Sequence, residues 1–395
     1  MSSESRTTRV AAPSVLQVLA HDLVGGTELL VLATADRLRE QGFDSEVAIL
    51  DVAGPVARQL SERGLAVHSL GGVRLGRVAA AVRLRRLIRR RRYDLVEAYG
   101  FKASLLARLV GRRARPQPRQ VCGVMGAHIT EVVELDELKG RFALRVERLT
   151  TGLVDAYDVI ALGAVELLAD NGIARERLHY IPNGVDLGVW TRRAEEPADR
   201  LIVCSARFVP RKRQEDLLRA AAELKRRGVA FRLKLAGTGP SLPAARRLAA
   251  ALSIEGEVDF LGALGADDVR ALLDQATVFC LPSLWEGIPA ATLEAMAVGV
   301  PVVSTDAPGT RDVIEDDSTG LLATPKDPQG LADRLELVLT NPARARSLAD
   351  AARRQVEREF SLDAMVARKQ ALYEQLIRSN GYPAASNRAG HVFCP

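Results

Sequence analysis

Residues 277–305 constrain the fold more than any other part of this chain. Residues 277–281 are apolar and have the composition of a buried strand. After a turn, residues 289–298 predict a helix, because proline is favourable at the first helical position and good helix formers follow it. Residues 301–305 then predict a second strand. A strand, a helix and a strand in this order predict one unit of a parallel sheet.

The same alternation of strands and helices fills residues 14–190 and residues 201–360. Each half therefore predicts a Rossmann-like α/β domain, in which helices cover both faces of a parallel sheet. Residues 191–200 are polar and lack periodicity, so we expect a linker there. Two such domains would place a central cleft between the ends of their strands. Residues 1–13 and 381–395 predict a disordered N-terminus and a flexible tail.

Two carboxylates, Glu286 and Glu294, flank the predicted start of the helix with seven residues between them. Free backbone amides at a helix start attract phosphate or sugar oxygens, and a carboxylate can accept hydrogen bonds from two neighbouring hydroxyls. This pattern predicts a site for a polyhydroxylated ligand that carries phosphate. An ordinary helix start, with Glu286 complementing the helix dipole and Glu294 solvated, is the alternative. The segment between the carboxylates that would contact the ligand comprises Gly287, Ile288, Pro289, Ala290 and Ala291.

Two basic residues, Arg207 and Lys212, lie in the loop after the predicted strand 201–205. Open α/β sheets bind ligands beyond the carboxyl ends of their strands. A guanidinium and an ammonium both suit phosphate oxygens, although ordinary loop charges are the alternative. No DxD motif and no His/Cys cluster with ligand spacing occurs, so we expect no catalytic metal.

A glycine pair, Gly25 and Gly26, lies in the loop between the first predicted strand and the first predicted helix. A strand, a glycine turn and a helix are typical of the start of a nucleotide-binding sheet. The loop lacks the GxGxxG pattern, so a dehydrogenase is not indicated. A simple tight turn is the alternative.

Residues 72–92 carry nine arginines and no acidic residue. Val78, Ala81, Val82 and Ile88 lie at helical spacing along this stretch. Two interpretations stay open: a solvated helix packed against the sheet, or an amphipathic helix on an anionic membrane surface. Nucleic acid is not expected as a partner, because aromatic residues are sparse and no binding motif accompanies the charge.

The apolar runs are too short to span a membrane, and the first residues lack the apolar centre of a signal peptide. Four scattered cysteines without a CxxC pair favour free thiols in a reducing compartment. We therefore expect a cytoplasmic protein, with the arginine-rich stretch as its candidate peripheral contact with the inner membrane face.

The run from Glu286 to Glu294 resembles the Glu-x7-Glu signature of a large family of retaining glycosyltransferases, family 4 or group 1, which has the GT-B fold. Arg207 and Lys212 match the family in type and spacing, and residues 180–186 resemble the segment before its second domain. The resemblance covers about residues 15–378 and is sharpest from Arg207 to Asp312.

This resemblance implies an enzyme that moves a sugar from a nucleotide diphosphate sugar, UDP- or GDP-linked, to a hydroxyl acceptor, in the synthesis of a cell-surface glycan, polysaccharide or glycolipid. The donor is a substrate, and no cofactor is implied. Arg207 and Lys212 would hold the diphosphate, Glu286 the transferred sugar and Glu294 the ribose. Gly25 and Gly26 would approach the donor phosphate or the acceptor. A helix over residues 361–378 would cross back to complete the first domain.

The chain departs from the family pattern at one position that bears on catalysis. Many relatives carry a histidine near the reacting sugar where this chain has Met125, while His128 lies three residues later. His128 is therefore a candidate contact for the substrate. Two rival functions stay open: a sugar-nucleotide epimerase of the same architecture, and a non-catalytic relative that binds a sugar nucleotide.

Overall fold

The computed structural model describes residues 12–20, 26–51, 54–125, 137–195, 197 and 199–379. Two of the predicted site residues, Gly25 and His128, lie outside these ranges, as does Cys394. Gly26 is the first residue of helix α1 (Gly26–Glu40). None of the helices in the described ranges is both long enough and apolar enough to cross a membrane.

The first half of the chain forms a parallel sheet of seven strands in the order β3-β2-β1-β4-β5-β6-β7. Two of its inner strands, β4 and β6, are buried along their whole length, as expected for a sheet covered on both faces. Besides α1, its elements are β1 (Ser14–Leu19), β2 (Asp44–Ile49), α2 (Pro55–Glu62), β3 (Ala66–Ser69), α3 (Gly72–Arg91), β4 (Leu95–Tyr99), α4 (Phe101–Gly111), β5 (Arg119–Val124), α6 (Glu137–Thr150), β6 (Ala156–Val159), α7 (Leu162–Asp170) and β7 (Leu178–Tyr180).

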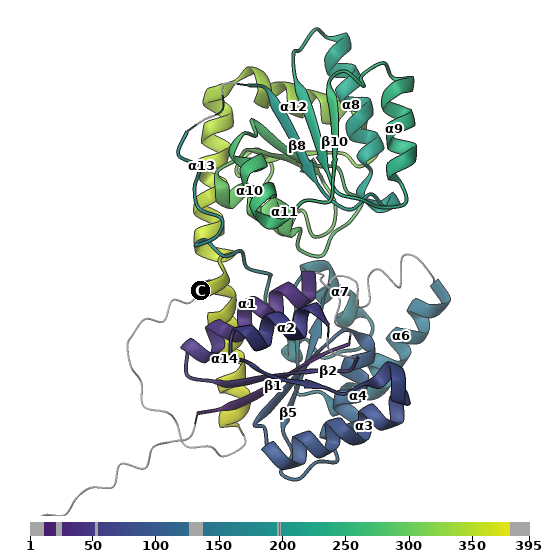
Figure 1. The fold of residues 1–395 in the computed structure, drawn as a ribbon, viewed down its shortest axis with the longest axis vertical. Helices are drawn as coiled ribbons and strands as arrows, with labels where there is room; N and C mark the ends of the chain where they lie inside the picture. The colour runs from purple at the N-terminus through teal and green to yellow at the C-terminus, as the bar shows by residue number, and fades with distance from the viewer. Residues whose placement is uncertain are drawn as a thin grey trace, which may run out of the picture.

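The second half forms a parallel sheet of six strands in the order β10-β9-β8-β11-β12-β13. Figure 1 shows this half above the first, with helices on both faces of its sheet. Its elements are β8 (Leu201–Ser205), α8 (Gln214–Arg226), β9 (Arg232–Ala236), α9 (Leu242–Ala251), β10 (Val258–Gly262), α10 (Ala266–Asp274), β11 (Val278–Leu281), α11 (Ala290–Val298), β12 (Val302–Thr305), β13 (Leu321–Ala323), α12 (Pro328–Thr340) and α13 (Pro342–Glu359).

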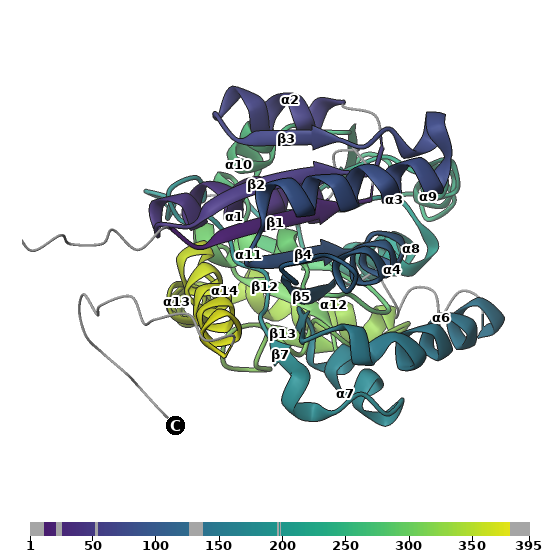
Figure 2. The same ribbon diagram turned by 90° about the horizontal axis from the view of Figure 1, so that it is seen from below.

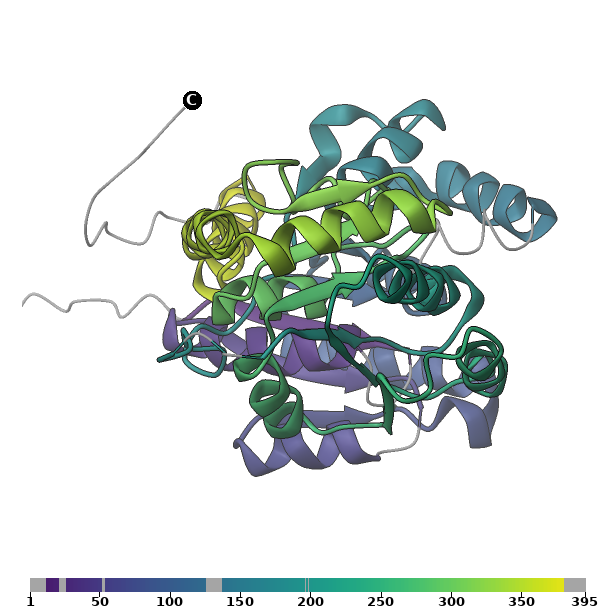
Figure 3. The ribbon, with the colours of Figure 1, turned by 90° about the horizontal axis from the view of Figure 1, so that it is seen from above.

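The last helix, α14 (Leu362–Arg378), returns to the first half and packs against α1. Val185, just after β7, pairs with Ser361 at the junction of α13 and α14. Figures 2 and 3 show the yellow C-terminal helices at one side of both halves. The chain therefore passes to the second half after β7 and returns at the start of α14, and the two connecting segments lie side by side.

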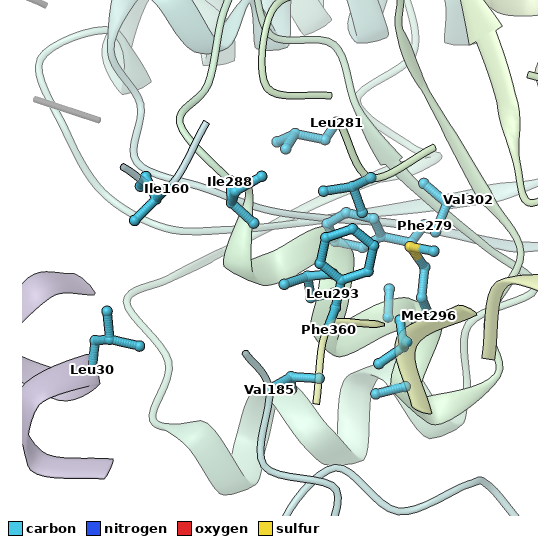
Figure 4. Close-up of a cluster of buried hydrophobic side chains, with 14 of the residues drawn as sticks. Leu30, Ile160, Val185, Phe279, Leu281, Ile288, Leu293, Met296, Val302 and Phe360 are labelled. Carbon is cyan, nitrogen blue, oxygen red and sulfur yellow. The ribbon is translucent and has the colours of Figure 1, made fainter. Parts of the chain in front are cut away.

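Apolar packing continues from one half into the other. The buried cluster drawn in Figure 4 takes Leu30 and Ile160 from the first half and Ile288, Leu293 and Phe360 from the second. Ile288 and Leu293 belong to the turn and helix that carry the two candidate carboxylates, so these carboxylates are positioned by buried neighbours.

Three details of the sequence prediction are wrong. The mostly apolar run of residues 158–162 predicts a strand over its whole length, but the strand ends at Val159, and Leu162 begins α7. Pro289 is the N-cap residue of α11 rather than its first helical residue. The inner side of α3 consists of Ala80, Leu84 and Ile88, whereas Val78 and Val82 face outward.

Candidate functional site

The carboxylate of Glu286 lies in a buried cluster with two basic side chains. Nη1 of Arg211 donates to Oε2 of Glu286 at 3.1 Å, and Nζ of Lys212 forms an ion pair with Oε1. Burial alone would raise the pKa of Glu286, but the charges of Lys212 and Arg211 outweigh it and hold this pKa below its usual value. Glu286 is therefore a carboxylate near neutral pH, and its charge is matched by two cations.

The sheet topology explains why residues far apart in sequence meet here. Lys212 and Glu286 are 74 positions apart, but their loops follow β8 and β11, which are neighbouring parallel strands. The loops therefore leave the same edge of the sheet. Trp285 completes the contact, because the guanidinium of Arg211 stacks 4.5 Å from the centre of its ring.

The backbone after Glu286 presents amides toward this edge. Pro289 caps α11 without a side-chain hydrogen bond, and its carbonyl accepts from Thr292 and Leu293. The amides of four residues donate no hydrogen bond to any acceptor in the described part of the chain, namely Gly287, Ile288, Ala290 and Ala291. The predicted row of unused donors thus lies at the positive end of the helix dipole.

Glu294 lies one helical turn further, at a different part of the site. It lines a pocket of about 420 Å³ between the two halves, together with Ala290 and Leu293 from α11 and residues of α1. Burial raises the pKa of Glu294 to about 7. Within the described part of the chain no hydrogen bond or ion pair is recorded for its carboxyl group, so this group can accept hydrogen bonds from a ligand.

Arg207 is placed differently from the other predicted cations. Its side chain is exposed and does not join the cluster of Lys212 and Glu286. Its loop packs closely on the turn after β9, since a Cβ at Gly237 would lie 2.0 Å from the carbonyl oxygen of Ala206. The structure thus brings Lys212 and Glu286 together and leaves the guanidinium of Arg207 at the surface.

A third loop, after β12, supports the turn that holds Glu286. The amide of Glu286 donates to the carbonyl of Pro308 at 2.9 Å. Gly309 has a positive φ of 77°, and a Cβ there would lie 1.9 Å from the carbonyl oxygen of Gly287. Only glycine fits this close approach of two backbones.

We expect Gly309→Ala to displace the Glu286 turn and to lower catalytic activity at least about tenfold, because misplaced catalytic groups lose rate steeply. Gly228 has nearly the same φ, 75°, but open space around it. Gly228→Ala is therefore the matched control for backbone strain alone. Steady-state kinetics of both variants measure the difference, and equal activities would show that the close contact at Gly309 has no role.

Asp312 connects the two halves beside the site. Its Oδ2 accepts a hydrogen bond of 2.7 Å from the amide of Leu162, the first residue of α7. The N-cap residue of α7, Ala161, has no side-chain oxygen, so the second half supplies the missing cap. Sequence reasoning missed this contact, and it missed Arg211 and Trp285, because nothing in the sequence fixes which loop side chains meet.

The described residues contain no group of three or more His, Cys, Asp or Glu side chains that could hold a metal ion. Three cysteines, Cys122, Cys204 and Cys280, are buried and free.

Comparisons with known proteins identify the family of the chain. Residues 24–189 match the model of "Glycosyltransferase Family 4", and residues 191–355 match that of "Glycosyl transferases group 1". The chain is 33% identical to the MMP α-(1→4)-mannosyltransferase of Mycolicibacterium hassiacum over 61% of this chain and 57% of that protein. It is 30% identical to the GDP-mannose-dependent α-(1-6)-phosphatidylinositol monomannoside mannosyltransferase of Mycobacterium tuberculosis over 48% of this chain and 54% of that protein. These matches therefore span just over half of each relative's length.

Two solved structures share the fold at low identity. Anabaena Alr3699/HepE in complex with UDP has a TM-score of 0.78 and 20% identity, covering 92% of this chain and 99% of that chain. Sucrose-phosphate synthase from Thermosynechococcus elongatus has a TM-score of 0.78 and 18% identity, covering 93% of this chain and all of that chain, 100%. The predicted GT-B fold is confirmed by these likenesses and by the two parallel sheets. The chain belongs to the group 1, family 4 glycosyltransferases.

Proposed function

We propose that this glycosyltransferase moves a sugar from a nucleotide diphosphate sugar to a hydroxyl acceptor with retention of anomeric configuration. One observation carries the proposal: Glu286 is held by Lys212 and Arg211 beside a row of unused amides, and Glu294 opens into the pocket between the two halves. Such a site offers cations and amides to a diphosphate and carboxylates to hydroxyls.

In the proposed reaction the bond between the sugar carbon and the diphosphate oxygen breaks, and negative charge builds on the leaving diphosphate. Lys212, Arg207 and the amides from Gly287 to Ala291 would stabilise that charge without a metal. Glu286 would orient the transferred sugar through its hydroxyls. The acceptor hydroxyl would give its proton to the departing phosphate and form the new bond on the same face, which retains the configuration.

The names of similar proteins support the donor class. One mannosyltransferase relative is GDP-mannose-dependent and acts on a phosphatidylinositol mannoside, and Anabaena HepE was solved with UDP. We therefore propose a UDP- or GDP-linked donor and an acceptor in cell-surface glycan, polysaccharide or glycolipid synthesis.

The test is a transfer assay with UDP-, GDP- and ADP-linked sugars and a set of hydroxyl acceptors, with the product anomer assigned by NMR. The proposal predicts acceptor-dependent turnover and a product with the donor's configuration. Donor conversion without an acceptor would indicate the epimerase, and donor binding without any turnover would indicate the non-catalytic relative. A product of inverted configuration would contradict the retaining mechanism.

Replacing Glu294 with glutamine should have opposite effects on nucleotide binding and on stability. At pH 8 the carboxylate is charged, so its loss should weaken nucleotide affinity about 10- to 100-fold, the scale of charged hydrogen bonds. The folded-state pKa of about 7 exceeds the ordinary value of 4.5, so the free protein loses stability as pH rises through 7. Glutamine carries no charge at any pH, so Glu294→Gln should recover part of this lost folding stability, up to about 3 kcal/mol at pH 8.

Calorimetric titration with nucleotide at pH 6 and pH 8, paired with urea unfolding, measures both effects. The wild type and Glu294→Gln should differ less in nucleotide affinity and in free energy of unfolding at pH 6, where the wild-type carboxyl is mostly protonated. Unchanged nucleotide affinity at pH 8 would contradict the role of Glu294 at the ribose.

A further inference from the structure

The positive charge of the chain is concentrated in one segment. Residues 63–130 contain 16 Arg and Lys residues but only two acidic residues, Asp94 and Glu97. The segment therefore carries a net charge of +14, whereas the rest of the chain, with 39 basic and 47 acidic residues, carries −8. This asymmetry is hidden in the modest overall charge of +6.

Both acidic residues of this segment point inward. Glu97 is fully buried and pairs with Lys369 of α14 at 2.9 Å. Asp94 is half-buried and accepts hydrogen bonds from the amide and the hydroxyl of Ser14 at 2.8 and 2.9 Å. Neither carboxylate can neutralise the arginines on the outer side of α3 and α4.

Helix α3 packs on the sheet through one side and exposes a mixed surface on the other. Ala80, Leu84 and Ile88 are buried, whereas Val78 is 78% exposed and Val82 is 52% exposed. Beside Val82 a surface depression of about 490 Å³ is lined by four arginines, namely Arg85, Arg86, Arg89 and Arg90. Apolar and cationic side chains thus share the outer face of this helix.

Helix α6 repeats the same combination. Phe142 is 64% exposed and Leu149 is 83% exposed, and their spacing of seven places them on one face of the helix. Arg145, between them, and Arg148 are exposed as well. Figures 1 and 2 show α6 on the same side of the first half as α3 and α4, away from α14.

Helix α4 contacts both of the other helices. It packs against α3, and its buried Arg108 binds Glu147 and Thr150 of α6 at 2.7 and 2.8 Å. Its own surface adds Leu109, which is 38% exposed, and is followed by the exposed Arg112.

We propose that the outer face of α3, α4 and α6 binds an anionic lipid bilayer. At a bilayer interface the apolar side chains enter the headgroup region while arginines contact lipid phosphates. A soluble polyanion would match the arginines but leave Val78, Phe142 and Leu149 in water. The combination of both chemistries on one face therefore favours a membrane. This inference does not depend on glycosyl transfer, since bilayer binding needs no donor.

The test is co-sedimentation of the full chain with vesicles of phosphatidylcholine, with or without phosphatidylglycerol at about one third of the lipid. Binding should require the anionic lipid and weaken with salt. Each arginine near an anionic surface contributes about fivefold to the partition coefficient, so Arg86→Gln with Arg90→Gln should weaken binding about 25-fold. Phe142→Glu should weaken it about tenfold or more, since it removes apolar burial.

Matched controls come from the second half. Arg219→Gln with Arg247→Gln removes the same charge from exposed positions, and Leu261→Glu alters an apolar side chain that is 37% exposed. Both control variants should bind as the wild type does. Equal binding to neutral and anionic vesicles, or no binding to either, would overturn the proposal. So would tight binding to polyglutamate or poly(U) that is lost in Phe142→Glu, because it would assign the face to a macromolecular polyanion.

Discussion

Replacing Lys212 with alanine is expected to lower the rate of sugar transfer at least about 10²-fold, the scale of losing one preorganised donor to a developing charge. Lys212 is the largely buried cation paired with Glu286. Arg211, the second cation on Glu286, stacks on Trp285. In the proposed reaction the ammonium exchanges Glu286 for a diphosphate oxygen. Without Lys212, Glu286 still pairs with Arg211. The leaving diphosphate, however, loses the ammonium that would stabilise its charge.

The control for this variant is Lys225→Ala, which removes an exposed lysine of the same half. Its transfer rate should equal that of the wild type. Single-turnover measurements with saturating donor separate the chemical step from binding. A Lys212→Ala enzyme with near-normal turnover would remove the leaving-group role from this residue.

Replacing Lys369 with methionine is expected to destabilise the protein by about 3–5 kcal/mol, the usual effect of leaving a buried charge without its partner. Lys369 is only 1% exposed and pairs with Glu97 at 2.9 Å and with Asp158. Tyr99 donates to the same Glu97 at 2.5 Å. These contacts fix α14 to the sheet of the first half, so their loss should release the helix that joins both halves.

Lys225 again supplies the control, because it pairs with Glu257 at the same distance, 2.9 Å, but is 46% exposed. Exposed pairs contribute about 0–1 kcal/mol, so Lys225→Met should change stability little. Urea unfolding at pH 7 compares the two variants. If both lose the same stability, burial of the Lys369 cluster does not hold α14 in place.

The sequence predicted the two parallel sheets because long buried strands and amphipathic helices leave clear periodic patterns. It missed the edge strand β3 (Ala66–Ser69), whose four residues are only partly buried and form no apolar run. It also extended the strand β6 to Leu162, since the apolar residues after Val159 do not show where an extended chain turns into helix.

The side of α3 that packs on the sheet could not be predicted because the helix carries two apolar rows. Val78 and Val82 are four positions apart, and Ala80, Leu84 and Ile88 repeat the same spacing on a neighbouring side. Spacing alone does not show which row is buried. In the structure Ala80, Leu84 and Ile88 are buried, and Val78 and Val82 are exposed.

Within the candidate site, the family resemblance assigned Lys212 and Glu286 to one ligand, but the sequence did not show that the two side chains touch. They meet because their loops follow β8 and β11, and the sequence pattern does not reveal that these strands are neighbours. Arg211 could not be distinguished from Arg207 or Arg213, since the choice depends on loop conformation. The stack of Arg211 on Trp285 is visible only in three dimensions.

A crystal structure with a bound nucleotide diphosphate sugar would show whether Lys212 and the free amides hold the leaving group. We expect diphosphate oxygens within hydrogen-bond distance of Nζ of Lys212 and of the amides between Gly287 and Ala291, with the ribose hydroxyls on Glu294. A diphosphate bound away from Lys212, with the ion pair to Glu286 intact, would contradict this expectation.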